Sequence, residues 1–211
     1  MIELRNVGIT VRGRVIVENG TATVAAHTVT HLVGPRGSGR STLIRAIAGV
    51  QRHSGSIRFD GEDLARVRAR LYACFDDAAL FPFLDGYDNV RRLLDRPLPS
   101  AVIAEVAPDI ADPSLLRLPA RRLSLGQRKR IHLLAALASD ARYLLLDETL
   151  DGADAPGTGE AIAALARRVP KATVLIAGGL DDPRGELEVR RIDLLNGSLI
   201  PTDDLADAIT A

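Results

Sequence analysis

A glycine-rich segment, His31–Leu43, has the residue types and spacing of a loop that binds phosphate groups. Glycine tolerates positive φ and lets backbone N–H groups converge on phosphate oxygens, and the N-terminus of a following helix adds a partial positive charge. A β-rich run precedes the segment and a periodic apolar run follows it, which predicts the order strand, loop, helix. A plain glycine-rich turn is the alternative. The residues expected to line the phosphates are Gly34, Pro35, Arg36, Gly37, Ser38, Gly39, Arg40, Ser41 and Thr42.

One position departs from the spacing that nucleotide-binding loops share. The pattern is a glycine, four residues, a second glycine, a lysine and then a serine or threonine, and only Arg40 breaks it by replacing the lysine. Arginine keeps the positive charge but carries a wide planar fork in place of a compact ammonium group. Ser41 keeps the hydroxyl that would bind Mg²⁺. The segment therefore predicts nucleotide and Mg²⁺ binding by a loop that is altered at one contact.

A pair of acidic residues, Asp147 and Glu148, follows the short apolar run that begins at Tyr143. In open α/β sheets, ligands bind at the carboxyl ends of the strands, which is also where a phosphate-binding loop emerges. We expect Asp147 to hold Mg²⁺ and Glu148 to be the catalytic residue that orients or deprotonates an attacking water. A solvated strand end is the alternative, and the phosphate-binding loop upstream favours the functional interpretation.

The elements that must position these residues begin with β-structure. Residues 2 to 33 carry β-branched residues around turn signals, which predicts short antiparallel strands. Residues 55 to 64 predict a strand and turn that return to the same sheet. Near the end of the chain, a hairpin is expected to turn at Asn196 and Gly197.

The middle of the chain is predicted to be helical and the following part to alternate strand and helix. From Asp85 to about Ala138 the pattern is mostly helical, and its prolines predict several short helices. Tyr143–Asp147 and Thr173–Ala177 are short continuous apolar runs, as buried parallel strands require. A helix is expected between them, over roughly residues 158 to 168, and the last ten residues predict a loose helix.

Composition limits the possible classes of protein. The chain has 211 residues, 46% of them hydrophobic, and a formal net charge of zero, so no global field attracts nucleic acid. Its single cysteine, Cys74, excludes an intramolecular disulfide framework and is expected to fill space in the core. The opening residues lack a signal-peptide pattern and no apolar run is long enough to span a bilayer. We expect a cytoplasmic protein that meets a membrane only through partners.

A third motif, "RRLSLGQRKR" at Arg121–Arg130, resembles the signature of the nucleotide-binding subunits of ATP-binding-cassette (ABC) transporters. In that family the signature opens a helix, precedes the acidic strand and completes the ATP site of a facing subunit. A basic helix start is the alternative, and the order of the three motifs disfavours it. Leu80–Val90 also resembles the family segment that meets the membrane subunits. The matching signature residues are Ser124, Leu125, Gly126 and Gln127.

The resemblance implies an α/β fold and a set of partners. The expected fold is a P-loop NTPase core with a mixed, largely parallel sheet, an N-terminal antiparallel β subdomain and an inserted helical subdomain. We expect one ABC-type nucleotide-binding domain over residues 1–211, with the antiparallel part at 1–30 and 55–64 and the helical part at about 85–138. The implied cofactors are ATP and Mg²⁺. The implied partners are a second nucleotide-binding subunit and transmembrane subunits, which would hold the chain at the inner face of the cell membrane.

Five residues depart from the family pattern where the family touches nucleotide. Val11 replaces an aromatic residue that stacks on adenine, and Arg40 replaces the loop lysine. Asp76 replaces a glutamine that contacts Mg²⁺; its carboxylate keeps the ability to bind metal but cannot donate a hydrogen bond. Leu125 replaces a signature glycine, which costs about 1 to 2 kcal/mol if positive φ is needed there. Gly179 stands where the family has its switch histidine.

These departures predict a slow, degenerate ATP site in an ATP-binding subunit of a membrane transporter. Losing one preorganised donor typically costs about 10² to 10³ in rate, and several losses are not additive. A heterodimer, in which a partner has a better site, is favoured over a homodimer. Asp154 resembles the aspartate that couples the two sites, with a surface loop acid as the alternative.

The alternative function is a non-catalytic regulator or adaptor. An ABC protein acting on DNA or ribosomes is disfavoured, because we find neither a long coiled-coil insertion nor tandem cassettes.

Overall fold

The computed structural model describes residues 1–76, 79–108, 110–150, 155–178 and 189–201. Within them, three strands form an antiparallel sheet in the order β2-β1-β4. These strands are β1 (Ile2–Val11), β2 (Arg14–Val24) and β4 (Ser54–Phe59).

A second, six-stranded sheet has the order β5-β6-β7-β3-β8-β9. Neighbouring strands from β5 to β8 pair in parallel, and β9 pairs antiparallel with β8. The strands are β3 (Val29–Val33), β5 (Leu71–Cys74), β6 (Tyr143–Asp147), β7 (Thr173–Ala177), β8 (Val189–Leu195) and β9 (Ser198–Pro201).

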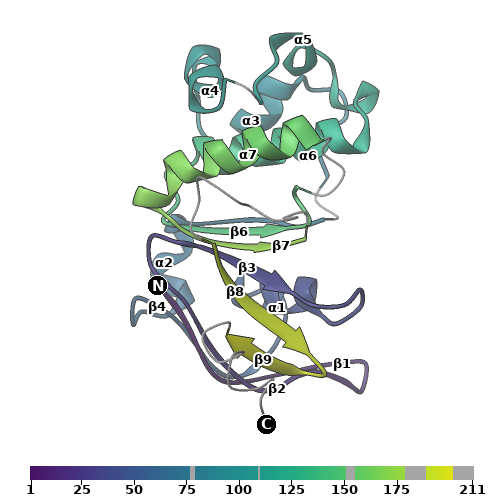
Figure 1. The fold of residues 1–211 in the computed structure, drawn as a ribbon. Helices are drawn as coiled ribbons and strands as arrows, with labels where there is room; N and C mark the ends of the chain where they lie inside the picture. Colours follow the sequence, from purple (N-terminus) through teal and green to yellow (C-terminus); the bar gives the residue numbers. More distant parts are fainter. Residues whose placement is uncertain (77–78, 109, 151–154, 179–188, 202–211) are drawn as a thin grey trace.

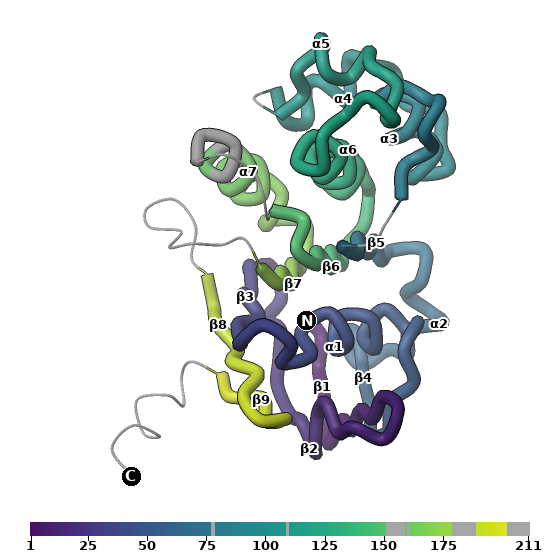
Figure 2. Tube along the Cα trace, turned by 90° about the vertical axis from the view of Figure 1, so that its right-hand side faces the viewer, coloured from purple at the N-terminus to yellow at the C-terminus, as the bar shows by residue number. Residues whose placement is uncertain are grey.

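Helices cover both faces of the six-stranded sheet (Figure 1). Helix α1 lies between the two sheets, and α6 and α7 pack on the opposite face beneath α3, α4 and α5 (Figure 2). The α-helices are α1 (Arg40–Ile47), α2 (Leu64–Val67), α3 (Gly86–Leu94), α4 (Ser100–Val106), α5 (Pro113–Leu116), α6 (Leu125–Ala138) and α7 (Ala155–Arg168). Short 3₁₀ turns cover Arg68–Arg70, Ala120–Arg122 and Val169–Lys171.

Side-chain alternation along β6 divides the core in two. Leu144 and Leu146 pack with the helices α3 to α7, whereas Tyr143 and Leu145 pack with α1 and the antiparallel sheet. This follows from the two-residue period of a strand whose faces are both buried. Asp147, the last residue of β6, therefore continues the face that α1 covers.

Most of the expected elements are confirmed. The strands at Tyr143–Asp147 and Thr173–Ala177 are present and parallel, and several short helices fall between Asp85 and Ala138. The terminal hairpin turns at Asn196 (φ 48°) and Gly197 (φ 84°), the left-handed pair that a tight hairpin requires.

The expectation that all of residues 2 to 33 form short antiparallel strands was wrong in two respects. β1 and β2 are 10 and 11 residues long. β3 leaves their sheet and pairs in parallel with β7 and β8. Alternation alone could not show the change of sheet, because parallel pairing depends on partners more than a hundred residues away. The residues of the expected C-terminal helix lie outside the described ones.

None of the helices in the described part of the chain combines the length and apolar character that crossing a bilayer requires.

We predict that Gly55→Ala destabilises the fold much more than Gly13→Ala. Both glycines have left-handed backbone (φ +75° and +80°), so an alanine at either one costs about 1 kcal/mol of strain. A Cβ at Gly55 would also lie 2.2 Å from the carbonyl oxygen of Asn6, whereas one at Gly13 has nothing within 4 Å. We expect a total loss at Gly55 of about 2 to 4 kcal/mol, measured by urea unfolding. Equal losses would contradict the close approach of β4 to β1.

Candidate functional site

The glycine-rich loop joins the end of β3 to the start of α1. Gly39 caps the helix in a left-handed conformation (φ 105°), and a Cβ there would lie 2.1 Å from Ile16. Gly37 is also left-handed (φ 81°), and its Cβ position is open. The Ser38 N–H donates to Pro35 O at 3.0 Å, which closes the turn. The expected order of strand, loop and helix is confirmed, and the loop places the N-terminus of α1 beside the end of β6.

A hydrogen bond connects this loop to the acidic strand. Ser41 Oγ donates to Asp147 Oδ1 at 3.0 Å, across 106 residues of sequence. The Asp147 side chain is buried, with the residue only 1% exposed. Its second oxygen, Oδ2, and Ser38 Oγ are buried polar atoms with no hydrogen-bond partner in the protein. Buried polar atoms are almost always satisfied, so the unpaired Oδ2 of Asp147 indicates a ligand at this carboxylate.

The chemistry of these residues fits Mg²⁺ bound together with a nucleotide. Among the described residues, no group of three or more histidine, cysteine, aspartate or glutamate side chains is arranged to hold a metal. Mg²⁺ is commonly held by one or two protein ligands, with substrate phosphates and water supplying the rest. Ser41 and Asp147 would be those protein ligands.

The protonation of Asp147 is set mainly by its burial. Desolvation raises the pKa of this carboxyl group, the hydrogen bond from Ser41 opposes the shift, and the nearby charge of Glu148 adds to it. Because the folded-state pKa lies above the unfolded-state value, the charged carboxylate costs folding free energy at neutral pH. That cost falls away as the pH drops through the folded-state pKa. A bound cation would offset it.

Glu148 occupies a strained position one residue beyond β6. Its φ of 50° is left-handed, which is unusual outside glycine. Its N–H donates to Ala177 O at 2.7 Å, so the strand pairing extends to this residue. The turn leaves Oε1 of Glu148 3.9 Å from Nη2 of Arg40. The altered loop residue thus faces the candidate catalytic carboxylate.

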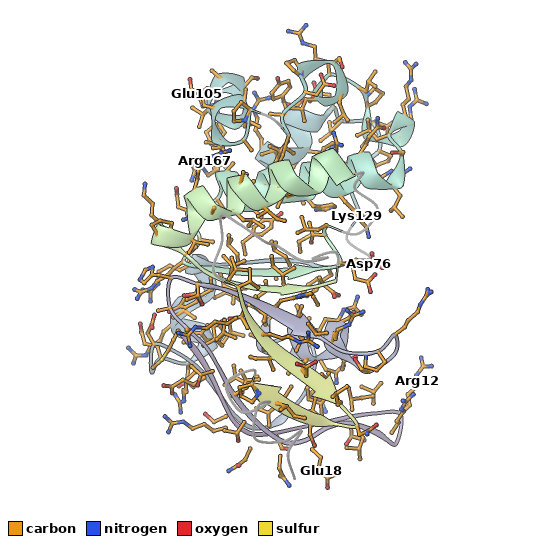
Figure 3. The ribbon with its side chains drawn as sticks, viewed as in Figure 1. Arg12, Glu18, Asp76, Glu105, Lys129 and Arg167 are labelled. Atoms are coloured by element: carbon orange, nitrogen blue, oxygen red, sulfur yellow. The ribbon has the colours of Figure 1, made fainter. Side chains whose placement is uncertain are left out.

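Asp76 forms an ion pair with a residue of the signature helix. Its Oδ1 lies 3.0 Å from Nζ of Lys129, which belongs to α6. Lys129 also donates to the backbone oxygen of Glu148 at 2.9 Å. Figure 3 shows Lys129 above Asp76 at one edge of the molecule. The sequence analysis missed Lys129, although its place two residues after Gln127 in a chain with only two lysines was a usable signal.

The signature residues form the start of α6. Ser124 Oγ accepts from the Gln127 N–H at 3.3 Å, and Gln127 Oε1 accepts from the Ser124 N–H at 2.9 Å, which makes a reciprocal capping box. Leu125 is the first helical residue and is not among those with positive φ, so it carries no left-handed strain here. Its side chain is 65% exposed. Gly126 follows it inside the helix.

Of the remaining candidate residues, the structure describes two and leaves two outside its described ranges. Val11 ends β1, where it is half-buried. Cys74 is buried, and burial raises the pKa of its thiol to about 11, in keeping with an unreactive core residue. Asp154 and Gly179 lie outside the described residues.

Comparison with known proteins decides the family. The family model described as "ABC transporter" matches residues 17–151, which is more than half of the chain. The chain belongs to the ABC transporter family. The match includes the phosphate-binding loop, the signature helix and the acidic strand.

Two curated ABC proteins illustrate the similarity. The Fe(3+) ions import ATP-binding protein FbpC of Streptomyces coelicolor is 37% identical over 158 residues, which cover 70% of this chain and 45% of that protein. The sulfate/thiosulfate import ATP-binding protein CysA of Escherichia coli is 39% identical over 137 residues, covering 59% of this chain and 38% of that protein. The matched segment thus spans less than half the length of either relative.

Solved ABC structures share the fold. The dimeric ATP-binding cassette MJ0796, in a post-hydrolysis state bound to ADP and Pi, aligns with a TM-score of 0.80 and 21% identity, covering 94% of this chain and 96% of that one. A structure described as an ATP binding subunit of an ABC transporter aligns with a TM-score of 0.82 and 17% identity, covering 100% and 93%. These likenesses confirm the predicted α/β fold with its P-loop core.

We predict that Asp147→Asn weakens Mg²⁺-dependent ATP binding by about 10- to 100-fold, the usual range for disrupting a metal site. Binding without Mg²⁺ should change little, because the loop amides remain. The variant should also unfold at a higher temperature without nucleotide, since a neutral amide is cheaper to bury than a carboxylate. Calorimetric titration and thermal unfolding measure the two effects.

Asp140→Asn is the matched control, because the Asp140 side chain is 86% exposed and pairs with Arg96 beyond the other end of α6. Equal effects of the two variants on ATP binding would contradict the assignment of Asp147.

Proposed function

We propose that this chain is the ATP-binding subunit of a membrane ABC transporter, which binds Mg²⁺–ATP at a dimer interface and couples binding or hydrolysis to transport. The observation that carries the proposal is the buried Ser41–Asp147 hydrogen bond, with the unsatisfied Oδ2 of Asp147 beside it. Family membership and the fold support it. Both curated relatives are described as import ATP-binding proteins, which favours import.

The chain's own residues divide the work of nucleotide binding. Loop N–H groups and the N-terminus of α1 bind the phosphates, and Ser41 and Asp147 orient Mg²⁺. Mg²⁺ supplies charge neutralisation to the phosphate oxygens. Glu148 would accept a proton from the water whose oxygen bonds to the γ-phosphorus as the bond to ADP breaks. The guanidinium of Arg40 lies 3.9 Å from that carboxylate, and its positive charge would make the carboxylate a weaker base, which supports slow chemistry at this site.

The signature residues support a role in the site of a facing subunit. Ser124 caps α6, and the helix N-terminus favours negative charge. Leu125 projects into solvent beside it, where it would meet the partner. We favour a heterodimer, because in a homodimer the departures at Arg40, Asp76 and Leu125 would recur in both sites.

An exposed aromatic segment supports contact with transmembrane subunits. Phe81 and Phe83, in the Leu80–Val90 segment, are 49% and 79% exposed. The guanidinium of Arg121 lies 5.6 Å from the ring centre of Phe83. Large exposed apolar side chains that lie together are typical of protein interfaces. Such a contact would hold the chain at the cytoplasmic face of the membrane.

The asymmetry of the proposed dimer can be measured on the transporter purified with this chain. We expect Glu148→Gln to slow Mg²⁺–ATP hydrolysis less than twofold, because most turnover occurs in the partner's site, whereas the equivalent change in the partner should slow it by about 10² or more. Equal losses from the two changes would contradict the asymmetry. A chain that binds no nucleotide in the presence of Mg²⁺ would instead be the non-catalytic adaptor.

A further inference from the structure

The two carboxylates that the sequence assigned to Mg²⁺ have different partners. Cys74, at the end of β5, packs with the helices α3 to α7, and Asp76 lies in the turn that follows the strand. Asp147 lies on the side of α1, where Ser41 bonds to it. Asp76 meets α6, and the side chain that it meets is Lys129.

Lys129 is placed to hold three parts of the site together. Its ammonium group lies 3.0 Å from Oδ1 of Asp76 and donates to the backbone oxygen of Glu148 at 2.9 Å. The lysine side chain is only 12% exposed, whereas that of Asp76 is 48% exposed. Lys129 also lies on the first turns of the helix that Ser124 caps. One cation thus links the signature helix, the loop after β5 and the end of β6.

Asp76 and Asp147 border the same space. Asp76, Lys129 and Asp147 all line one cavity of about 450 Å³. Within this cavity, the ammonium of Lys129 neutralises the carboxylate of Asp76 at 3.0 Å. A divalent cation bound with ATP at Asp147 would compete for the same carboxylate.

We propose that Asp76 has two mutually exclusive partners, Lys129 in the nucleotide-free protein and Mg²⁺ in the nucleotide-bound protein. The Lys129–Asp76 pair is then a latch that ties the turn after β5 to the signature helix until Mg²⁺–ATP opens it. Lys129 is a positioning residue that sets how much Mg²⁺ the site requires. The inference rests on the proposed nucleotide binding and adds how that binding reaches the surface that faces a partner.

The test is the Mg²⁺ concentration that gives half-maximal binding of a fluorescent ATP analogue at fixed nucleotide. Lys129→Met removes the ammonium group and keeps a side chain of similar length. Mg²⁺ then binds Asp76 without competition from Lys129. The midpoint should fall about 2- to 5-fold, the size expected for a partly exposed ion pair. Lys129→Arg, which keeps the charge, should restore most of the wild-type midpoint.

Two further variants make the result specific. Lys171→Met is the matched control, because Lys171 is the chain's other lysine and lies at the far end of α7, in the following 3₁₀ turn. Asp76→Asn should raise the midpoint, and adding Lys129→Met to it should change nothing further, since the competition has already gone. An unchanged or higher midpoint in Lys129→Met alone, or additive effects of the two changes, would overturn the proposal.

A second readout separates the latch from the proposed function. If the wild-type protein binds no nucleotide at any Mg²⁺ concentration, the proposed function fails. Hydrogen exchange on the nucleotide-free protein then tests the contact alone. Asp76→Asn should speed amide exchange at the start of α6, and Lys129→Met should speed it at least as much, because it also removes the bond to Glu148 O. The double variant should exchange no faster than Lys129→Met alone, and an unchanged rate in Asp76→Asn or additive effects would overturn the latch.

Discussion

The hydrogen bond from Ser41 to Asp147 is the contact on which the rest of the site depends. It joins the first turn of α1 to the end of β6 and so fixes the loop against the acidic strand. It forms because Asp147 continues the β6 face that packs on α1. Burying a carboxylate there is unfavourable, as its raised pKa records, and one of its oxygens has no partner. A bound cation would offset this cost.

Around that contact, several charged groups pair with one another. Arg40 faces Glu148, and Lys129 bridges Asp76 and the backbone of Glu148. Each pair would have to open or adjust before its members could engage phosphate, metal or water. Arg40 and Asp76, which the sequence analysis interprets as departures from the family pattern, thus both have charged neighbours within the chain.

The sequence was sufficient to predict the parts of the structure that depend on local order. The glycine loop, the strand ending at Asp147 and the helix opening at Ser124 follow from spacing, periodicity and capping residues, and the structure has all three. The partner of Asp76 could not be predicted in this way, because the pairing joins the turn after β5 to α6, which is distant in sequence. The transfer of β3 to the parallel sheet was missed for the same reason, since its partners are distant in sequence. The strain expected at Leu125 is absent because that residue is already helical.

We propose that Ser41 and Asp147 form one Mg²⁺–nucleotide site in this chain. Isothermal titration of the wild-type protein with ATP, in Mg²⁺ and then in excess chelator, measures this directly. We expect one ATP bound per chain in Mg²⁺ and much weaker binding in chelator. Absence of binding, or the same affinity in both conditions, would contradict it.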